Sequence, residues 1–159
     1  MTEPDLQASG RLTLRRGTPH DTRGICALLA AAFPDNPKRD ADVYRWQYWD
    51  NPFGPPVVWV WEDGGAIVCH GAVFAAPGLL GGRAVVLGHT ADAATAVPHR
   101  GSGLFARLTR ARFEDAPRKG MAVSLSLPNP KSLPGVVQAG LHPVARVAAY
   151  VLPLDDAWL

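Results

Sequence analysis

The chain has 159 residues, of which 47% are hydrophobic and 19% are charged, a composition typical of a single globular domain. A formal net charge of +2 is too small for us to expect nucleic acid as the main partner. No apolar run approaches the ~18 residues of a membrane span, and the first residues lack the apolar centre of a signal peptide. We therefore expect a cytoplasmic protein with no membrane partner. The two cysteines, Cys26 and Cys69, are predicted to be buried thiols rather than a disulfide framework.

The first predicted elements follow a polar N-terminus, residues 1–10, which is expected to be flexible. Residues 11–16 alternate between apolar and polar side chains and are typical of a strand. The stretch Thr18-Pro19-His20-Asp21 indicates a helix start, because threonine can cap it, proline fits the first turn and aspartate favours the positive end. This helix is expected to end at Pro34. A second helix, rich in aromatic residues, is predicted over residues 39–50.

The rest of the chain alternates between strand patterns, helix patterns and turn signals, of which Asp63-Gly64-Gly65 is a tight hairpin signal. Strands are predicted over residues 57–62, 66–76, 83–97, 121–127 and 144–152. Helices are predicted over residues 101–116 and, as a short weak one, 131–140. The order β-α-α-β-β-β-α-β-α-β predicts one α/β domain over residues 11–154, followed by a tail of residues 155–159.

The segment from Asp92 to Phe105, DAATAVPHRGSGLF, carries the clearest chemical signal. In this segment a predicted strand is followed by the loop Arg100-Gly101-Ser102-Gly103, and the loop is followed by a predicted helix. Glycine lets the backbone approach a ligand closely, and the unpaired N–H groups of a first helical turn suit a pyrophosphate. Arg100 can add a charged contact. On the glycines alone, an ordinary strand–helix turn with a surface arginine stays open as the alternative.

In its wider context this segment resembles the acyl-CoA-binding motif of the GNAT acetyltransferases, Arg/Gln-x-x-Gly-x-Gly/Ala after a strand. Arg100 and Gly103 match the motif, and Phe105 stands where glycine or alanine is usual. Three further stretches resemble one branch of the family, in the right order: Trp46 to Pro52, Leu127 to Asn129, and Ala139 to Leu141. The resemblance implies a mixed, mostly antiparallel sheet with helices on both faces and a splay between the fourth and fifth strands.

The resemblance also implies that acetyl-CoA is bound in that splay as the acyl donor, without a metal. The pantetheine arm would pair with the backbone of Ala93, Ala94 and Thr95. The pyrophosphate would lie on the loop that follows. Asn129 would contact the same molecule, although a turn asparagine is equally expected there. The expected binding residues are Ala93, Ala94, Thr95, Arg100, Gly101, Ser102, Gly103, Leu104, Phe105 and Asn129.

Candidate acids and bases surround this motif. Asp92 is the expected general base that takes the proton of the acceptor amine, unless it only bonds the backbone or binds the acceptor. His89 is a second candidate, with a core or strand-edge histidine as the alternative. In the resemblance, the family's tyrosine acid falls at Val136, so the usual acid is missing. His142 and Ser132 lie nearby, and nothing in the sequence selects either of them.

The aromatic residues Tyr44, Trp46, Tyr48 and Trp49 either line an acceptor pocket or pack against the sheet. Trp59 and Trp61 share one strand face and are expected in the core or an interface. The expected function is acetyl transfer from acetyl-CoA to an amine of a small molecule or a protein. A non-catalytic acyl-CoA-binding module and a shortened interaction domain stay open as alternatives, as does a homodimer.

Overall fold

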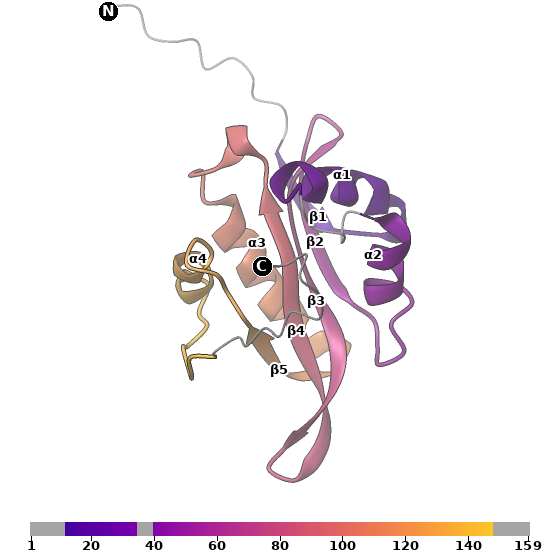
Figure 1. Ribbon diagram of the computed structural model, residues 1–159, viewed down its shortest axis with the longest axis vertical. Coiled ribbons are helices and arrows are strands. Elements are labelled where there is room, and N and C mark those ends of the chain that lie inside the picture. Colours follow the sequence, from indigo (N-terminus) through magenta and orange to yellow (C-terminus); the bar gives the residue numbers. More distant parts are fainter. Residues whose placement is uncertain (1–11, 35–39, 148–159) are drawn as a thin grey trace, which may run out of the picture.

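A computed structural model describes residues 12–34 and 40–147, where five strands form one sheet with helices on both faces (Figure 1). The strands are β1 (Thr13–Arg16), β2 (Val57–Asp63), β3 (Ala66–Leu80), β4 (Arg83–Thr95) and β5 (Met121–Ser126). The α-helices are α1 (Thr22–Ala32), α2 (Ala41–Tyr48), α3 (Leu104–Asp115) and α4 (Leu133–Gln138). Short 3-10 helices are η1 (Pro19–Asp21), η3 (Val97–His99) and η4 (Pro117–Lys119). The predicted α/β class is confirmed, and the N-terminus and tail predicted at residues 1–10 and 155–159 lie outside the described residues.

The sheet is mixed, because β1 to β4 pair antiparallel in sequence order and β5 joins β4 in parallel. The pairing of β4 with β5 runs from Val86 to Thr90, while β4 itself continues to Thr95. β5 ends at Ser126, opposite Thr90, and beyond this pair a cavity separates the end of β4 from the segment that follows β5. The expected splay between the fourth and fifth strands is therefore present.

Alternation along β2 divides the core into two layers. Val58 and Val60 pack against α1 and α2 on one face of the sheet. Trp61 faces the other way and packs on α3, where its indole Nε1 donates to the carbonyl of Leu104 at 3.1 Å. Trp59 packs on the same α3 face, so both tryptophans belong to the core, as predicted. Cys26 and Cys69 are free, buried thiols, which confirms that prediction too.

A bulge in β4 sits where the splay opens. Between the pairs His70–Ala94 and Ala72–Ala91, β3 has one residue and β4 has two, Asp92 and its neighbour. Asp92 has a φ of 53° and is the only non-glycine residue with positive φ in the described part of the chain. Aspartate tolerates this left-handed conformation better than most residues, and a bulge re-aims the side chains around it. The sheet thus turns the Asp92 carboxylate out of the regular strand pattern.

Two predicted boundaries were wrong for clear reasons. The Pro77-Gly78 turn signal did not end β3, which continues to Leu80. The turn is made by Gly81 and Gly82, whose φ values of 57° and 76° suit a two-residue hairpin. The predicted helix from residue 101 begins only at Leu104, because two glycines of the preceding loop also have positive φ.

The last predicted strand, residues 144–152, was wrong over its described part. Residues 144–147 form no strand and join no ladder of the sheet, and residues 148–152 lie outside the described residues. Val144 and Val147 are 90% and 74% exposed, so their apolar alternation does not reflect burial in a sheet. In the described ranges, no helix has the length and apolar character needed to cross a membrane.

Candidate active site

The loop between β4 and α3 has the backbone shape expected of an anion-binding turn. Gly101 and Gly103 have φ values of 80° and 79°, which few residues other than glycine adopt easily. A Cβ built on either glycine would meet no heavy atom within 4 Å, so the space above the loop is open. The Ser102 hydroxyl donates to the carbonyl of His99 at 2.6 Å and braces the loop from within. The N–H groups at the start of α3 follow directly.

A cavity of about 410 Å³ lies between this loop and the bulged end of β4. Its walls contain every predicted binding residue except Ser102, whose hydroxyl is used inside the loop. The residues that line it and were predicted are Ala93, Ala94, Thr95, Arg100, Gly101, Gly103, Leu104, Phe105 and Asn129. Segments from the strand, the loop, the helix and the turn after β5 thus meet at one place.

Arg100 and Asn129 each have a structural contact and a place on the cavity wall. The Arg100 Nε donates to the carbonyl of Thr95 at 3.1 Å, which holds the guanidinium at the cavity. The Asn129 Oδ1 accepts from the backbone N–H of Lys131 at 3.0 Å and of Ser132 at 2.9 Å. The turn-asparagine alternative is therefore correct, and the same residue also borders the cavity.

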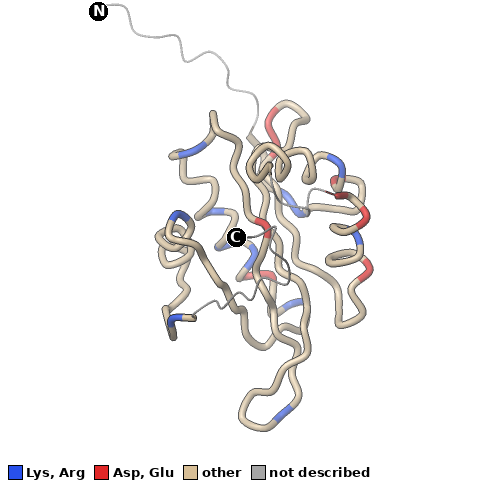
Figure 2. Tube along the Cα trace, in the orientation of Figure 1, with Lys and Arg blue, Asp and Glu red and all other residues tan. Residues whose placement is uncertain are grey.

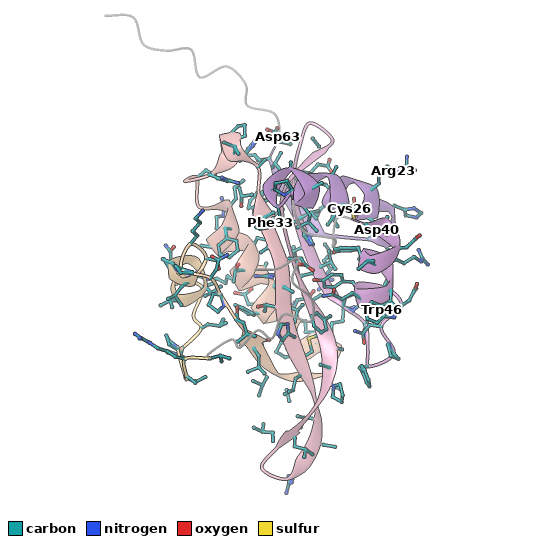
Figure 3. The ribbon with its side chains drawn as sticks, viewed as in Figure 1. Arg23, Cys26, Phe33, Asp40, Trp46 and Asp63 are labelled. Carbon is teal, nitrogen blue, oxygen red and sulfur yellow. The ribbon has the colours of Figure 1, made fainter. Side chains whose placement is uncertain are left out.

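Sequence reasoning missed Lys131 as a wall residue. It follows the Asn129 turn and adds a second cation to the cavity that Arg100 borders. Phe33, at the end of α1, lines the cavity as well and is labelled in Figure 3. Lys131 could have been found from its position two residues after Asn129, which was a predicted contact. Nothing in the sequence indicated that Phe33 reaches the cavity.

A smaller cavity of about 210 Å³ continues from the first along the splay. The two share Phe33, Ala93, Phe105, Asn129 and Ser132. The smaller cavity adds Asp92 from the bulge and Val136 from α4. Val136 is 5% exposed and offers no proton, so the acid that the family resemblance implies is absent at this wall.

The carboxylate of Asp92 is held in place by a tyrosine of helix α2. The Tyr48 hydroxyl donates to Asp92 Oδ2 at 2.6 Å. Burial, together with the negative charge of Asp92, raises the pKa of Tyr48 well above its usual value, so the phenol keeps its proton. The contact fixes the orientation of the carboxylate at the wall of the smaller cavity.

The aromatic residues of α2 are mainly packing residues. Tyr44 and Tyr48 are buried with ring centroids 4.4 Å apart, and the Trp49 Nε1 donates to Thr22 Oγ1 at 2.9 Å. Trp46 is 71% exposed and points away from the sheet (Figure 3). None of the four borders either cavity, and Tyr44, Tyr48 and Trp49 pack in the core as the packing alternative predicted, whereas Trp46 does not. Their helical spacing predicted the packing but not the hydroxyl contact of Tyr48.

The other acid and base candidates are divided between two places. His89 stacks on Phe74 with ring centroids 4.9 Å apart and borders a separate apolar groove between β5 and α4. His142 borders the same groove. Ser132 lies on the walls of both cavities of the splay, and its hydroxyl donates to the carbonyl of Asn129 at 3.2 Å. Among these candidates, only Asp92 and Ser132 lie beside the splay.

Arg112 of α3 is a cavity residue that sequence reasoning missed. It is 1% exposed and lines the smaller cavity. Its Nη1 donates to the carbonyl of Ala72 and its Nη2 to Thr109 Oγ1, both at 3.0 Å. Burial lowers the pKa of Arg112 to about 10, so it is still charged at neutral pH. The signal was its position four residues after Leu108 on the buried face of the helix.

Comparison with known proteins adds independent support. A family model described as an acetyltransferase (GNAT) domain matches residues 13–135. No curated protein sequence matches the chain significantly. The solved structure of an acetyltransferase from Trypanosoma brucei has 25% sequence identity to this chain and a TM-score of 0.65. The match covers 89% of this chain and 99% of the Trypanosoma brucei chain.

Two further solved structures share the fold at lower identity. Glucosamine-6-phosphate N-acetyltransferase from Arabidopsis thaliana is 16% identical over 89% of this chain and 99% of its own, with a TM-score of 0.69. The aminoglycoside N-acetyltransferase AAC(6′)-Iy, in complex with the bisubstrate analogue CoA-S-monomethyl-acetylneamine, is 13% identical over 90% of this chain and 99% of its own, with a TM-score of 0.72. Because the family model spans most of the sequence and the fold agrees along it, the chain belongs to the GNAT acetyltransferase family.

Proposed function

We propose that the chain transfers the acetyl group of acetyl-CoA to an amine acceptor, on a small molecule or a protein. The observation that carries this proposal is the continuous pair of cavities in the splay, with the glycine loop at one end and Asp92 at the other. An elongated acyl donor with an anionic pyrophosphate and a thioester end matches that arrangement.

The loop end suits the pyrophosphate. Backbone N–H groups of residues 101–105 surround the start of α3, and Arg100 and Lys131 supply positive charge at the cavity wall. Figure 2 shows further basic residues along α3, of which only Arg112 borders a cavity of the splay. The pantetheine arm would follow the exposed backbone edge of β4 at Ala93 to Thr95, beyond the last pair with β5.

The chemistry is direct transfer. The amine nitrogen attacks the thioester carbonyl carbon, a C–N bond forms and the C–S bond breaks with its electron pair passing to sulfur. Asp92 accepts the proton that the nitrogen loses, directly or through a water. Tyr48 keeps the carboxylate oriented for this role and stays protonated itself.

Val136 supports a second candidate, a domain that binds acyl-CoA without transferring the acyl group. The matching family position holds the acid that protonates the leaving thiolate, and valine cannot do so. A cysteine-like thiol has a pKa of about 8.5, so the thiolate can leave at neutral pH without a dedicated acid. Transfer is therefore expected to be slower than with an acid, and not abolished.

Calorimetric titration with acetyl-CoA, beside free-thiol release across a panel of amino sugars, polyamines and peptide amines, separates these functions. Saturable binding with amine-dependent thiol release supports transfer. Binding without release from any amine favours the binding domain. A folded chain that gives no binding heat contradicts both.

A further inference from the structure

Arg112 is the most deeply buried cation of the described chain that also lines a cavity. It reaches from α3 to the underside of β3, where its guanidinium meets the Ala72 carbonyl beside Gly71. Its Nη2 donates a hydrogen bond to Thr109 Oγ1, and its Nε has no hydrogen-bond partner within the described ranges. Few buried guanidinium nitrogens are left unsatisfied without a functional reason.

The chain pairs its other structural arginines with carboxylates. Arg15 donates hydrogen bonds to the carboxylates of Asp21 and Glu62. Arg16 donates to the carboxylate of Asp115, which lies on the same helix as Arg112. The ion pairs found among residues 12–34 and 40–147 do not include Arg112. Burying a charge is costly unless a nearby anion compensates it. An anion that is present only during the reaction satisfies this requirement at a functional site.

Arg112 lines the smaller cavity together with the candidate base, which indicates where such an anion would form. Arg112 is the only cationic side chain on the described wall of the smaller cavity, which also contains Asp92 and Val136. Three other titratable groups interact with it electrostatically: Tyr48 from α2, and Cys69 and His70 from β3. None of them is charged at neutral pH, because burial raises the pKa of Tyr48 and of Cys69 and lowers the pKa of His70 to about 3. Arg112 thus keeps a fixed positive charge at the acyl end of the splay.

We propose that Arg112 stabilises the negative charge that develops on the sulfur of the acyl donor, and so replaces electrostatically the proton donor that is missing at Val136. This inference rests on the proposed function. As the C–S bond breaks, its electron pair goes to sulfur, the amine proton goes to Asp92, and the thiolate leaves unprotonated and later takes a proton from water. A preorganised charge held by a largely buried side chain acts on such a thiolate more strongly than a charge in bulk water does, because the local dielectric constant is lower.

The test measures the ionisation of the CoA thiol on the protein, and needs no acceptor. Thiolate absorbance of CoA bound to the wild-type chain is followed against pH and compared with free CoA. The acid dissociation constant of the bound thiol is expected to be at least about tenfold larger than that of free CoA. Arg112→Met should remove most of this difference and Arg112→Lys should retain much of it. Arg110→Met is the matched control, since Arg110 is exposed on the same helix and borders neither splay cavity, and it should titrate as wild type.

Each result decides the proposal. If bound CoA titrates like free CoA in the wild type, Arg112 does not stabilise the thiolate, while the proposed transferase function survives. The same conclusion follows if Arg112→Met leaves the shifted titration unchanged. If CoA does not bind the folded wild type at all, the proposed function and this inference fall together. The wild-type comparison remains decisive even if Arg112→Met does not fold.

Discussion

The Tyr48 hydroxyl donates a 2.6 Å hydrogen bond to Asp92 Oδ2, and this contact joins helix α2 to the bulge of β4 across 44 positions of sequence. It ties the aromatic layer over one face of the sheet to the wall of the smaller cavity. Removing the hydroxyl with Tyr48→Phe should lower kcat about tenfold, because the carboxylate loses its orientation, and should change acetyl-CoA affinity little. Tyr44→Phe is the matched control, one turn earlier in the same cluster: its hydroxyl contacts His70 at 3.3 Å and not Asp92. Equal kcat losses in both variants would mean that the effect is only packing.

Asp92→Asn should lower turnover by about 10²-fold or more if the carboxylate accepts the amine proton. Asparagine tolerates the positive φ of 53° at this position, so the bulge should survive and acetyl-CoA affinity should stay close to wild type. The pH–rate profile of the variant should lose its acidic limb. A variant with near-normal turnover would restrict Asp92 to a structural role in the bulge.

Gly103→Val should weaken acetyl-CoA binding at least about tenfold, or ~1.4 kcal/mol, because a β-branched side chain disfavours the φ of 79° and obstructs the loop surface. Gly82→Val tests the backbone cost alone, since Gly82 has a φ of 76° and lies in the hairpin turn between β3 and β4. Calorimetry on both variants measures the difference. Unchanged affinity in a folded Gly103→Val protein would remove the loop from the binding site.

Val136→Tyr should raise turnover by supplying a phenol to the cavity that contains Asp92 and Arg112. The increase should be larger in an Arg112→Met background, where the stabilising charge is absent. Val136 is only 5% exposed, so overpacking could cost ~1–3 kcal/mol, which thermal unfolding would detect. A stable double variant that gains no activity relative to Arg112→Met would argue against a missing acid.

The stability of the fold should decrease as pH falls below the pKa of an unfolded histidine. Burial lowers the pKa of His70 from 6.5 to about 3, so the unfolded chain binds a proton in this window that the folded chain does not. The contribution of His70 to the dependence of the unfolding free energy on pH should approach ~1.4 kcal/mol per pH unit between pH 6 and 4. His70→Gln should flatten that part of the profile in denaturant unfolding. Parallel profiles would show that His70 does not contribute.

The geometry of the loop between β4 and α3 was predictable, because its signal is local. Two glycines, an arginine and a following helix lie within a few residues, and the required positive φ values belong to the glycines themselves. Arg100 and Gly103 were therefore placed correctly at the cavity. The same reasoning ended β3 too early at Pro77, because the pairing of that strand with β4 outweighed the local turn signal.

The acyl end could not be predicted in the same way, since it depends on contacts between distant elements. The positive φ of Asp92 follows from unequal residue counts between β3 and β4, which no single strand pattern reveals. The burial of Arg112 depends on its reaching the Ala72 carbonyl, 40 positions away. Its position four residues after Leu108 places it on the buried face of α3, but an arginine adds nothing to a pattern of apolar residues and is therefore overlooked there.

Acetyl transfer is best tested by mass-spectrometric detection of an acetylated amine after acetyl-CoA and the amine panel are incubated with the wild-type and Asp92→Asn proteins. We expect the wild type to form one acetylated product for each CoA released, and Asp92→Asn to form it about 10²-fold more slowly. A folded wild-type protein that binds acetyl-CoA and acetylates no amine of the panel would contradict the proposed acetyl transfer.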